Sequence, residues 1–514
     1  MRFKNSIRNM LSELIPQVVL LIIGLLKVKF FVQILGDDIN GFNLTISSIV
    51  AYLTMVEGGF GTSLMQKLYE PLAKNDTEKV KELYLGSERI LHIIGLVILI
   101  LGVIVSFFMP HLTEGVFSSG YAILLFLIII VPTAMSYFIM APVMVVIADQ
   151  KHYKVNIILK SLQIIRGLVQ IAFLFLGFDY IWLVVMDGLT VFMQYYLSRL
   201  MAFKEYPYLK NCKGVKRDMS AWENTKHVFV HKISSTVKSR SATIIILFTY
   251  PGTIGLSLTS IFGSYNYIIN TFNEVMSGVL NAPKESFAHL LVTEKQRVYA
   301  TYKQFLVLTY FIATILCVTT FITINDFVLL WLNQPSYIQT SAVAILFTYM
   351  LFEAMVRIPI HAMRDISGLF KESKAYAVLE ASVTVILGII LTKTFKITGV
   401  LMAMLIGSII SGFILNPRLV YKRVFKKNLL WFYYDIIKQI LIMVVVSIMA
   451  FNIWTVFLEA NCVSLVLWFL NAGLLFLIII ILSFMLYFVF LKEFRLFIKN
   501  LWTKLKKHVQ RGNI

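Results

Sequence analysis

Polar side chains follow one face of an otherwise apolar segment, residues 155–177. This stripe, at helical spacing, consists of Asn156, Lys160, Gln163 and Gln170. Arg166 lies at its edge, roughly 16 Å from the start of the segment if the segment is helical. Near the middle of a membrane a charged side chain costs about 2.5–3.5 kcal/mol and usually faces a wet interior. The stripe therefore predicts a polar cavity lining, and a helix-packing seam joined by amides is the alternative.

Two other apolar segments each carry a basic pair. Lys27 and Lys29 lie in the first segment, and Lys238 and Arg240 lie in the seventh. Guanidinium and ammonium groups form charge-assisted hydrogen bonds with phosphate oxygens, and Arg does so bidentately. We expect Lys27, Lys238 and Arg240 to join Arg166 in an anion-binding lining, whereas Lys29 is close enough to the surface to snorkel.

The later segments contribute further polar groups. Asn270 and Glu274 share a face of residues 254–280, and Glu353 and Arg357 are one helical turn apart within residues 338–361. We assign Asn270 and Arg357 to the cavity lining. An internal Glu353–Arg357 ion pair is the alternative for Arg357, because the order of the two charges favours it.

Four carboxylates inside apolar segments are candidates for coupling to a proton or another ion. They are Glu57, Asp187, Glu274 and Glu353. Burial raises the pKa of a carboxyl group, which suits proton uptake near neutral pH. The alternative is that these residues are counter-ions for the basic side chains.

The composition places all these residues in a membrane protein. The 514-residue chain is 58% hydrophobic and only 14% charged, whereas soluble domains are about one quarter charged. Fourteen segments can each cross a hydrocarbon core of about 30 Å. They are residues 11–34, 41–66, 87–109, 121–148, 155–177, 180–201, 228–250, 254–280, 302–324, 338–361, 374–392, 397–416, 434–457 and 463–491. The predicted class is an all-α polytopic membrane protein.

The distribution of Lys and Arg predicts the orientation of the chain. Basic residues crowd both ends and alternate connections, among them residues 202–227 and 417–427. The other connections are short and nearly free of them. Cytoplasmic loops collect Lys and Arg, so we expect both termini in the cytoplasm. The formal net charge of +20 is then explained by Lys and Arg residues that gather on the cytoplasmic side of the membrane. We therefore expect no nucleic-acid partner.

Two segments near the starts of the two halves resemble each other. "GFNLTISSIV" at 41–50 matches "GLSLTSIFGS" at 255–264, and Thr77-Glu78-Lys79 matches Thr293-Glu294-Lys295, at an offset near 215. Six helices per repeat give two lobes of the same orientation, related as parallel repeats. The predicted organisation is an N-terminal lobe at 1–201, a basic linker at 202–227, a C-terminal lobe at 228–416, two extra helices at 417–491 and a basic tail at 492–514.

No pattern for catalysis or metal binding is present in the sequence. The chain lacks a phosphate-binding glycine loop with a lysine and hydroxyl, an HExxH motif and a nucleophile elbow. The three cysteines have no metal-ligand spacing. We therefore expect a protein that is not an enzyme and has no cofactor.

The tail beyond Leu491 has amphipathic spacing. Its apolar face carries Phe494, Phe497, Ile498, Leu501, Leu505 and Val509, and lysines occupy the other positions. The pattern predicts an interfacial helix on an anionic membrane leaflet, with a solvated tail as the alternative.

Residues 34–79, "ILGDDINGFNLTISSIVAYLTMVEGGFGTSLMQKLYEPLAKNDTEK", resemble the opening of the polysaccharide transporter family. These Wzx-type flippases belong to the multidrug/oligosaccharidyl-lipid/polysaccharide exporter superfamily. The resemblance implies two lobes around a cationic cavity in a bacterial cytoplasmic membrane. It also implies an undecaprenyl-diphosphate-linked oligosaccharide as substrate, moved by alternating access for cell-surface polysaccharide biosynthesis. Membrane lipids would surround the protein, and a polysaccharide polymerase and glycosyltransferases are candidate partners. Two alternatives remain: a cation-coupled multidrug exporter, or a non-transporting scaffold for glycan assembly.

Overall fold

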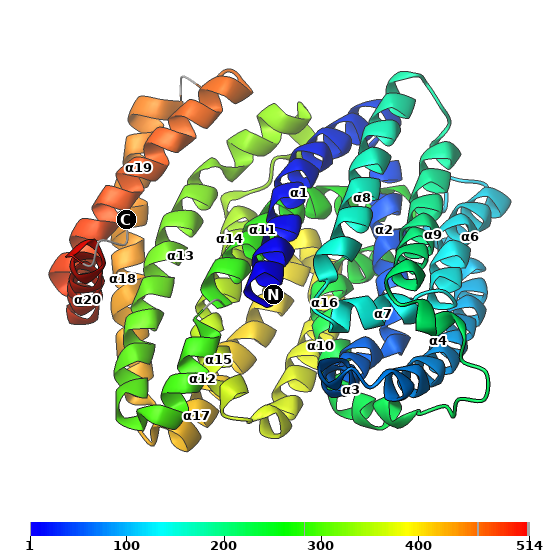
Figure 1. Cartoon of the computed structure of the whole chain (residues 1–514). Coiled ribbons are helices and arrows are strands. Elements are labelled where there is room, and N and C mark those ends of the chain that lie inside the picture. The colour runs from blue at the N-terminus through cyan, green and yellow to red at the C-terminus, as the bar shows by residue number, and fades with distance from the viewer. Residues whose placement is uncertain (1, 282, 460–461, 511–514) are drawn as a thin grey trace. The chain divides into compact units, whose positions relative to one another are not determined.

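The computed structural model describes residues 2–281, 283–459 and 462–510, and all regular elements within these ranges are helices (Figure 1). Eleven helices in the described ranges are long and apolar enough to cross a membrane. One of these, Lys371–Phe425, contains two predicted spans separated by a kink at Lys396. The predicted seventh and eighth spans correspond to α10 and α11, of 30 and 29 residues. The predicted all-helical class with about fourteen spans is confirmed.

The contacts divide the chain into two units, Met1–Gly263 and Ser264–Ile514. The helices that begin in the first unit are α1 (Arg2–Phe30), α2 (Asp37–Thr54), α3 (Phe60–Lys74), α4 (Thr77–Ser106), α5 (Met109–Leu112), α6 (Ser119–Tyr137), α7 (Ala141–Ala148), α8 (His152–Phe175), α9 (Tyr180–Glu205), α10 (Ser220–Thr249) and α11 (Thr253–Asn281). A π-helical turn, Phe31–Leu35, extends α1.

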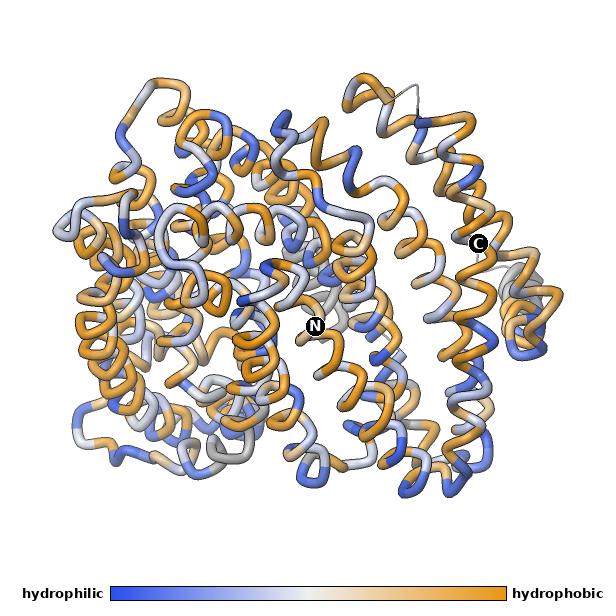
Figure 2. The backbone as a smooth tube through the Cα atoms, turned by 180° about the vertical axis from the view of Figure 1, so that it is seen from behind, coloured by the Kyte–Doolittle hydropathy of each residue, from blue (hydrophilic) through white to orange (hydrophobic). Residues whose placement is uncertain are grey.

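The second unit continues from α11. Its helices are α12 (Lys284–Thr293), α13 (Lys295–Leu332), α14 (Ser341–Val356), α15 (Ile358–Ile366), α16 (Phe370–Ser408), α17 (Asn416–Val420), α18 (Leu430–Ile453), α19 (Leu465–Phe490) and α20 (Lys492–Gln510). Hydrophobic residues follow the middle of the long helices, and hydrophilic residues gather at helix ends (Figure 2).

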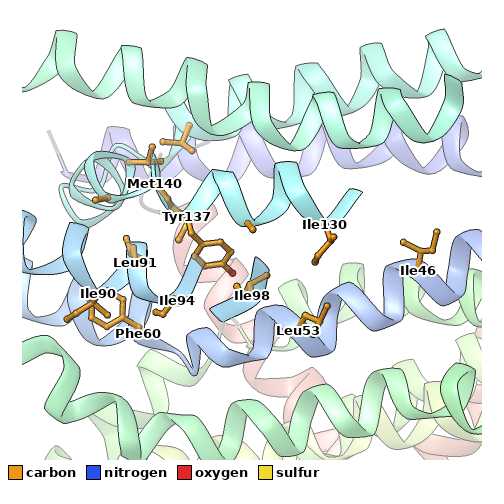
Figure 3. Packing of buried hydrophobic residues seen from close by; sticks show 14 of the residues in the cluster. Ile46, Leu53, Phe60, Ile90, Leu91, Ile94, Ile98, Ile130, Tyr137 and Met140 are labelled. Carbon is orange, nitrogen blue, oxygen red and sulfur yellow. The ribbon is translucent and has the colours of Figure 1, made fainter. Parts of the chain in front are cut away.

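The first unit is organised around a core of interlocked aliphatic and aromatic side chains. Ile46 and Leu53 of α2 belong to the same buried cluster as Ile94 and Ile98 of α4 and Ile130 of α6 (Figure 3). The last turns of α6 add Tyr137, and α7 follows after a short break. In a bilayer, where lipid is as apolar as leucine, such van der Waals packing replaces the hydrophobic effect as the force between helices.

Structural features recur at the spacing of the predicted repeat. Gly36 precedes α2 with φ 97°, and Gly252 precedes α11 with φ 76°, a conformation that glycine adopts without strain. The fourth and tenth spans are each broken near a proline, Pro142 at the start of α7 and Pro359 at the start of α15. The two glycines, and likewise the two prolines, are separated by nearly the same number of residues as the sequence matches, an offset near 215.

The linker after α9 is docked on α4. The Asp218 amide donates to the Glu82 carbonyl oxygen at 3.0 Å, and a Cβ on Gly86 would overlap the Asp218 carbonyl. Lys79 Nζ lies 2.9 Å from Asp218 Oδ2. Although partial burial raises the pKa of Asp218, the hydrogen bonds from Lys79 and Ser220 outweigh it and lower the pKa to about 2. The basic linker is therefore attached to the first unit.

The helix α10 also packs within the first unit, against α2 and α3. The sequence places α10 at the start of the C-terminal lobe, because the repeat begins there. The two units are defined by contacts between residues, whereas the predicted lobes are defined by the sequence repeat. The lobe boundaries at 201 and 228 therefore stay predictions.

Candidate substrate-binding site

A basic cluster in the first unit brings together three side chains that the sequence singles out. Arg166 of α8 forms an ion pair with Asp187 of α9, with Nη1 3.1 Å from Oδ1. Lys27 of α1 interacts electrostatically with both of them. By formal charge, two basic side chains interact with one carboxylate, so the cluster has a formal excess of one positive charge. We name Lys27, Arg166 and Asp187 the basic cluster.

Close helix packing explains how Lys27 comes near Arg166. α1 and α8 pack along their length. At Gly167, beside Arg166, a Cβ would overlap the side chain of Ile23. Ile23 lies one turn before Lys27, so the missing Cβ lets α1 approach α8 at the level of the cluster. The Lys27 ammonium also lies 5.0 Å from the centroid of the Phe31 ring, a cation–π contact.

The ion pair of the cluster is only partly buried. The Arg166 side chain keeps 30% of its surface exposed and that of Asp187 keeps 15%. A guanidinium has five N–H donors, and the single bond to Asp187 leaves the exposed ones able to bind an anion.

The amides of the predicted stripe join helices to one another. Gln170 is fully buried, and its Nε2 donates to the Leu183 carbonyl oxygen at 2.7 Å. From α9, Gln194 Nε2 donates to the Leu159 carbonyl oxygen at 3.0 Å. Lys160 Nζ donates to Gln17 Oε1 of α1 at 3.0 Å, and Gln163 is half-buried. Gln170 therefore fills the packing role that the sequence left as the alternative, and Gln17 is a partner that sequence reasoning missed.

Glu57 lies at the break between α2 and α3. Its carboxylate accepts from the Gly61 amide at 3.3 Å, and the Tyr137 hydroxyl donates to it at 3.5 Å. The two bonds tie Glu57 to the start of α3 and to the end of α6, so this carboxylate is held by neutral donors.

The remaining lining candidates lie on α10 and α11. On α10, Lys238 is half-buried and Arg240 is exposed. On α11, Asn270 and Glu274 are both exposed, in the part of the helix that belongs to the second unit. Their exposure is compatible with the predicted lining, and their role stays a prediction.

Arg357 lies in a buried network in the second unit. Its Nη1 donates to Glu353 of the same helix turn and, at 2.9 Å, to Glu380 Oε1 of α16. Its Nη2 donates to Glu380 Oε2 at 2.8 Å and to Ser411 Oγ at 3.3 Å. The three charged side chains expose between 6% and 9% of their surface. We name Glu353, Arg357 and Glu380 the buried triad.

The triad realises the ion pair that the sequence offered as the alternative for Arg357. A Cβ on Gly412 would come within 2.8 Å of Arg357 Nε, so the glycine provides the room for the guanidinium. Glu380 was missed by sequence reasoning. It is a carboxylate within the predicted span 374–392, and the rule that selected Glu353 would have found it.

Metal binding has no support in the described part of the chain, where no group of three or more His, Cys, Asp or Glu side chains could hold an ion.

Comparisons with known proteins identify the fold. No family model and no curated protein matches the sequence. Among solved structures, the lipid II flippase MurJ in an inward closed conformation has a TM-score of 0.67, with 16% identity over 95% of this chain and 99% of that one. An inward-facing MATE-family multidrug resistance transporter has a TM-score of 0.59, with 14% identity over 81% of this chain and 98% of that one.

A further similar structure is a MOP-superfamily transporter from Pyrococcus furiosus, with a TM-score of 0.58, 14% identity and coverage of 83% and 97%. All three are MOP-superfamily transporters, and this chain has their fold. It is a multi-pass membrane protein.

Proposed function

We propose that the protein is a flippase for a lipid-linked oligosaccharide whose lipid and sugar are joined by a diphosphate. The formal positive excess of the basic cluster carries the proposal, because a partly exposed guanidinium and an ammonium lie near one carboxylate within predicted spans. A fold similar to that of a lipid II flippase supports it.

The basic cluster has the chemistry to hold a diphosphate. Two closely spaced phosphates concentrate negative charge, and a charge-assisted bond to Arg is about twice as strong as a neutral one. The attraction is stronger than in water because the surrounding dielectric constant is low. Asp187 would keep the Arg166 guanidinium in position while the site is empty, and the diphosphate would compete with it for the donors.

Release of the substrate requires a second conformation, which we propose is reached by alternating access. The headgroup would move through a cationic cavity while the lipid tail stays in the bilayer. Glu57 is our candidate for proton coupling among the four carboxylates, because neutral donors hold it and a proton would neutralise its charge. Asp187 and Glu353 already have guanidinium partners.

The predicted setting completes the proposal. The protein would lie in a bacterial cytoplasmic membrane with both termini in the cytoplasm. There it would receive undecaprenyl-diphosphate-linked repeat units from glycosyltransferases and pass them to a polymerase for surface polysaccharide.

A multidrug exporter is the second candidate, since similar structures include multidrug transporters. Such a protein needs negative charge to attract cationic drugs, whereas the basic cluster has a positive excess. Transport of a rhodamine cation, tested in the same vesicles as the lipid substrate, separates the two functions.

The test is a flipping assay in reconstituted vesicles with a fluorescent undecaprenyl-diphosphate disaccharide and a membrane-impermeant quencher. Arg166→Ala should reduce flipping by at least about tenfold, the effect of losing roughly 1.4 kcal/mol of substrate interaction. Arg89→Ala, which removes an exposed arginine of α4, is the matched control and should flip at the parental rate.

The double variant Arg166→Ala/Asp187→Asn decides between substrate binding and a structural role. If Arg166 only neutralises Asp187, removal of both charges should restore flipping. If Arg166 binds the diphosphate, the double variant should be stable and inactive. Restored flipping would overturn the assignment of Arg166.

A further inference from the structure

Three membrane spans of the second unit end close together in a basic, aromatic-edged surface. α13 and α18 begin there, and α19 ends there, one residue before α20. The exposed basic residues of this surface are Lys422, Arg423, Lys426, Lys427, Lys492, Arg495 and Lys499. We name these seven residues the basic collar.

The start of α13 joins the two halves of the collar. The Tyr299 ring lies 5.1 Å from Phe425, and Lys427 Nζ lies 4.8 Å from the Tyr299 centroid. One turn further along α13, Lys303 Nζ lies 2.9 Å from Glu493 Oε1 of α20. The loop after α17 and the helix α20 are therefore held on one support.

The first turn of α20 is locked in place by a buried aromatic residue. Phe494 is 1% exposed, and its ring lies 5.0 Å from Phe311 of α13 and 5.6 Å from Tyr487 of α19. Leu491, in an extended conformation, interrupts the helix between α19 and α20. α20 thus begins at a fixed point beside the end of a candidate membrane span.

The two carboxylates beside the collar share one lysine, so one formal negative charge remains against the seven basic residues. Glu493 and Asp435 both bind Lys303, at 2.9 and 3.1 Å. Large apolar side chains beside the collar stay uncovered: Trp431 is 56% exposed, Leu501 45% and Trp502 64%. Basic residues next to exposed tryptophans are the chemistry of the headgroup region of an anionic bilayer.

We propose that the basic collar binds anionic phospholipid headgroups and that α20 lies along the membrane surface, with Leu501 and Trp502 inserted among the lipids. In the sequence, Lys504, Lys506 and Lys507 follow. The inference does not depend on the transported substrate.

Hydrogen exchange of the full-length protein in nanodiscs tests the proposal. The probe is phosphatidylglycerol, present at about one third of the lipid or absent from phosphatidylcholine discs. We expect amides of residues 495–510 to exchange at least about tenfold more slowly with phosphatidylglycerol. The variant K422Q/K426Q/R495Q/K499Q should lose this difference.

The matched control removes four exposed charges from the linker of the first unit, in K210Q/K213Q/K216Q/R217Q. It should keep the lipid-dependent protection. Equal exchange in the two lipids would assign α20 to protein contacts or to a second copy, and would overturn the proposal. If the control variant also loses the lipid-dependent protection, the protection depends only on the net charge of the protein, and the proposal is overturned.

Discussion

The basic cluster and the buried triad are charged groups within the membrane spans of the two units, and they have opposite charge excess. The basic cluster combines two cations with one carboxylate, and the buried triad combines one guanidinium with two carboxylates. They also differ in exposure: Arg166 is 30% exposed and Arg357 is 9% exposed. A guanidinium already held by two carboxylates has little to offer an anion, whereas the exposed one in the cluster can bind it. The same residue type therefore serves folding in one unit and, we propose, the substrate in the other.

Arg357→Met should have the largest effect on stability. It leaves Glu353 and Glu380 buried without their cation, and loss of one partner from a buried ion pair costs about 3–5 kcal/mol. We expect a large fall in thermal stability in detergent. Arg357→Met/Glu353→Gln/Glu380→Gln should recover most of it. A stable Arg357→Met protein would contradict a structural role for the triad.

Arg166→Met should have a small effect on stability and a large effect on transport. Its side chain is partly exposed and Lys27 remains to balance Asp187, so we expect a loss of only about 1 kcal/mol of stability. Flipping of the fluorescent lipid substrate should nevertheless fall at least about tenfold. A stability loss as large as that of Arg357→Met would remove the distinction between the two sites.

Glu353→Gln should be milder than Glu380→Gln. Glu380 holds the guanidinium bidentately, and that pair stays intact and neutral overall when Glu353 loses its charge. We expect a loss below about 1 kcal/mol for Glu353→Gln and about 1–3 kcal/mol for Glu380→Gln. Thermal unfolding of the two variants, side by side, measures the difference, and the reverse order would contradict this geometry.

Asp218→Asn provides a surface reference for both internal sites and should have the smallest effect. The Lys79–Asp218 pair is partly exposed, so we expect a loss of at most about 1 kcal/mol near neutral pH. Because folding lowers the pKa of Asp218 to about 2, the stabilisation is present above the ordinary carboxyl pKa and decreases as the pH falls from about 4 towards 2. The free energy of unfolding of the parent and the variant should be measured at pH 7, 5 and 3.5. The difference between the two proteins should be smaller only at pH 3.5.

Sequence reasoning located most of the charged groups but could pair them only within one helix, as for Glu353 and Arg357. A charge inside an apolar run is visible without coordinates, and so Arg166, Asp187, Lys27, Glu353 and Arg357 were all identified. The partner across helices is not visible, because it depends on how two helices are rotated and offset. The bond from Gln170 to the backbone of α9 is an example, whereas Glu380 is a charge inside a predicted span and is visible by the rule that selects Glu353.

The sequence by itself determined the all-helical membrane class and the approximate spans, because hydrocarbon thickness and helix rise convert directly into segment length. Only the tertiary structure decided which charges neutralise one another. Missing Cβ atoms at Gly167 and Gly412 make room for Ile23 of α1 and for the Arg357 guanidinium, respectively, and such close approaches follow from packing rather than from periodicity.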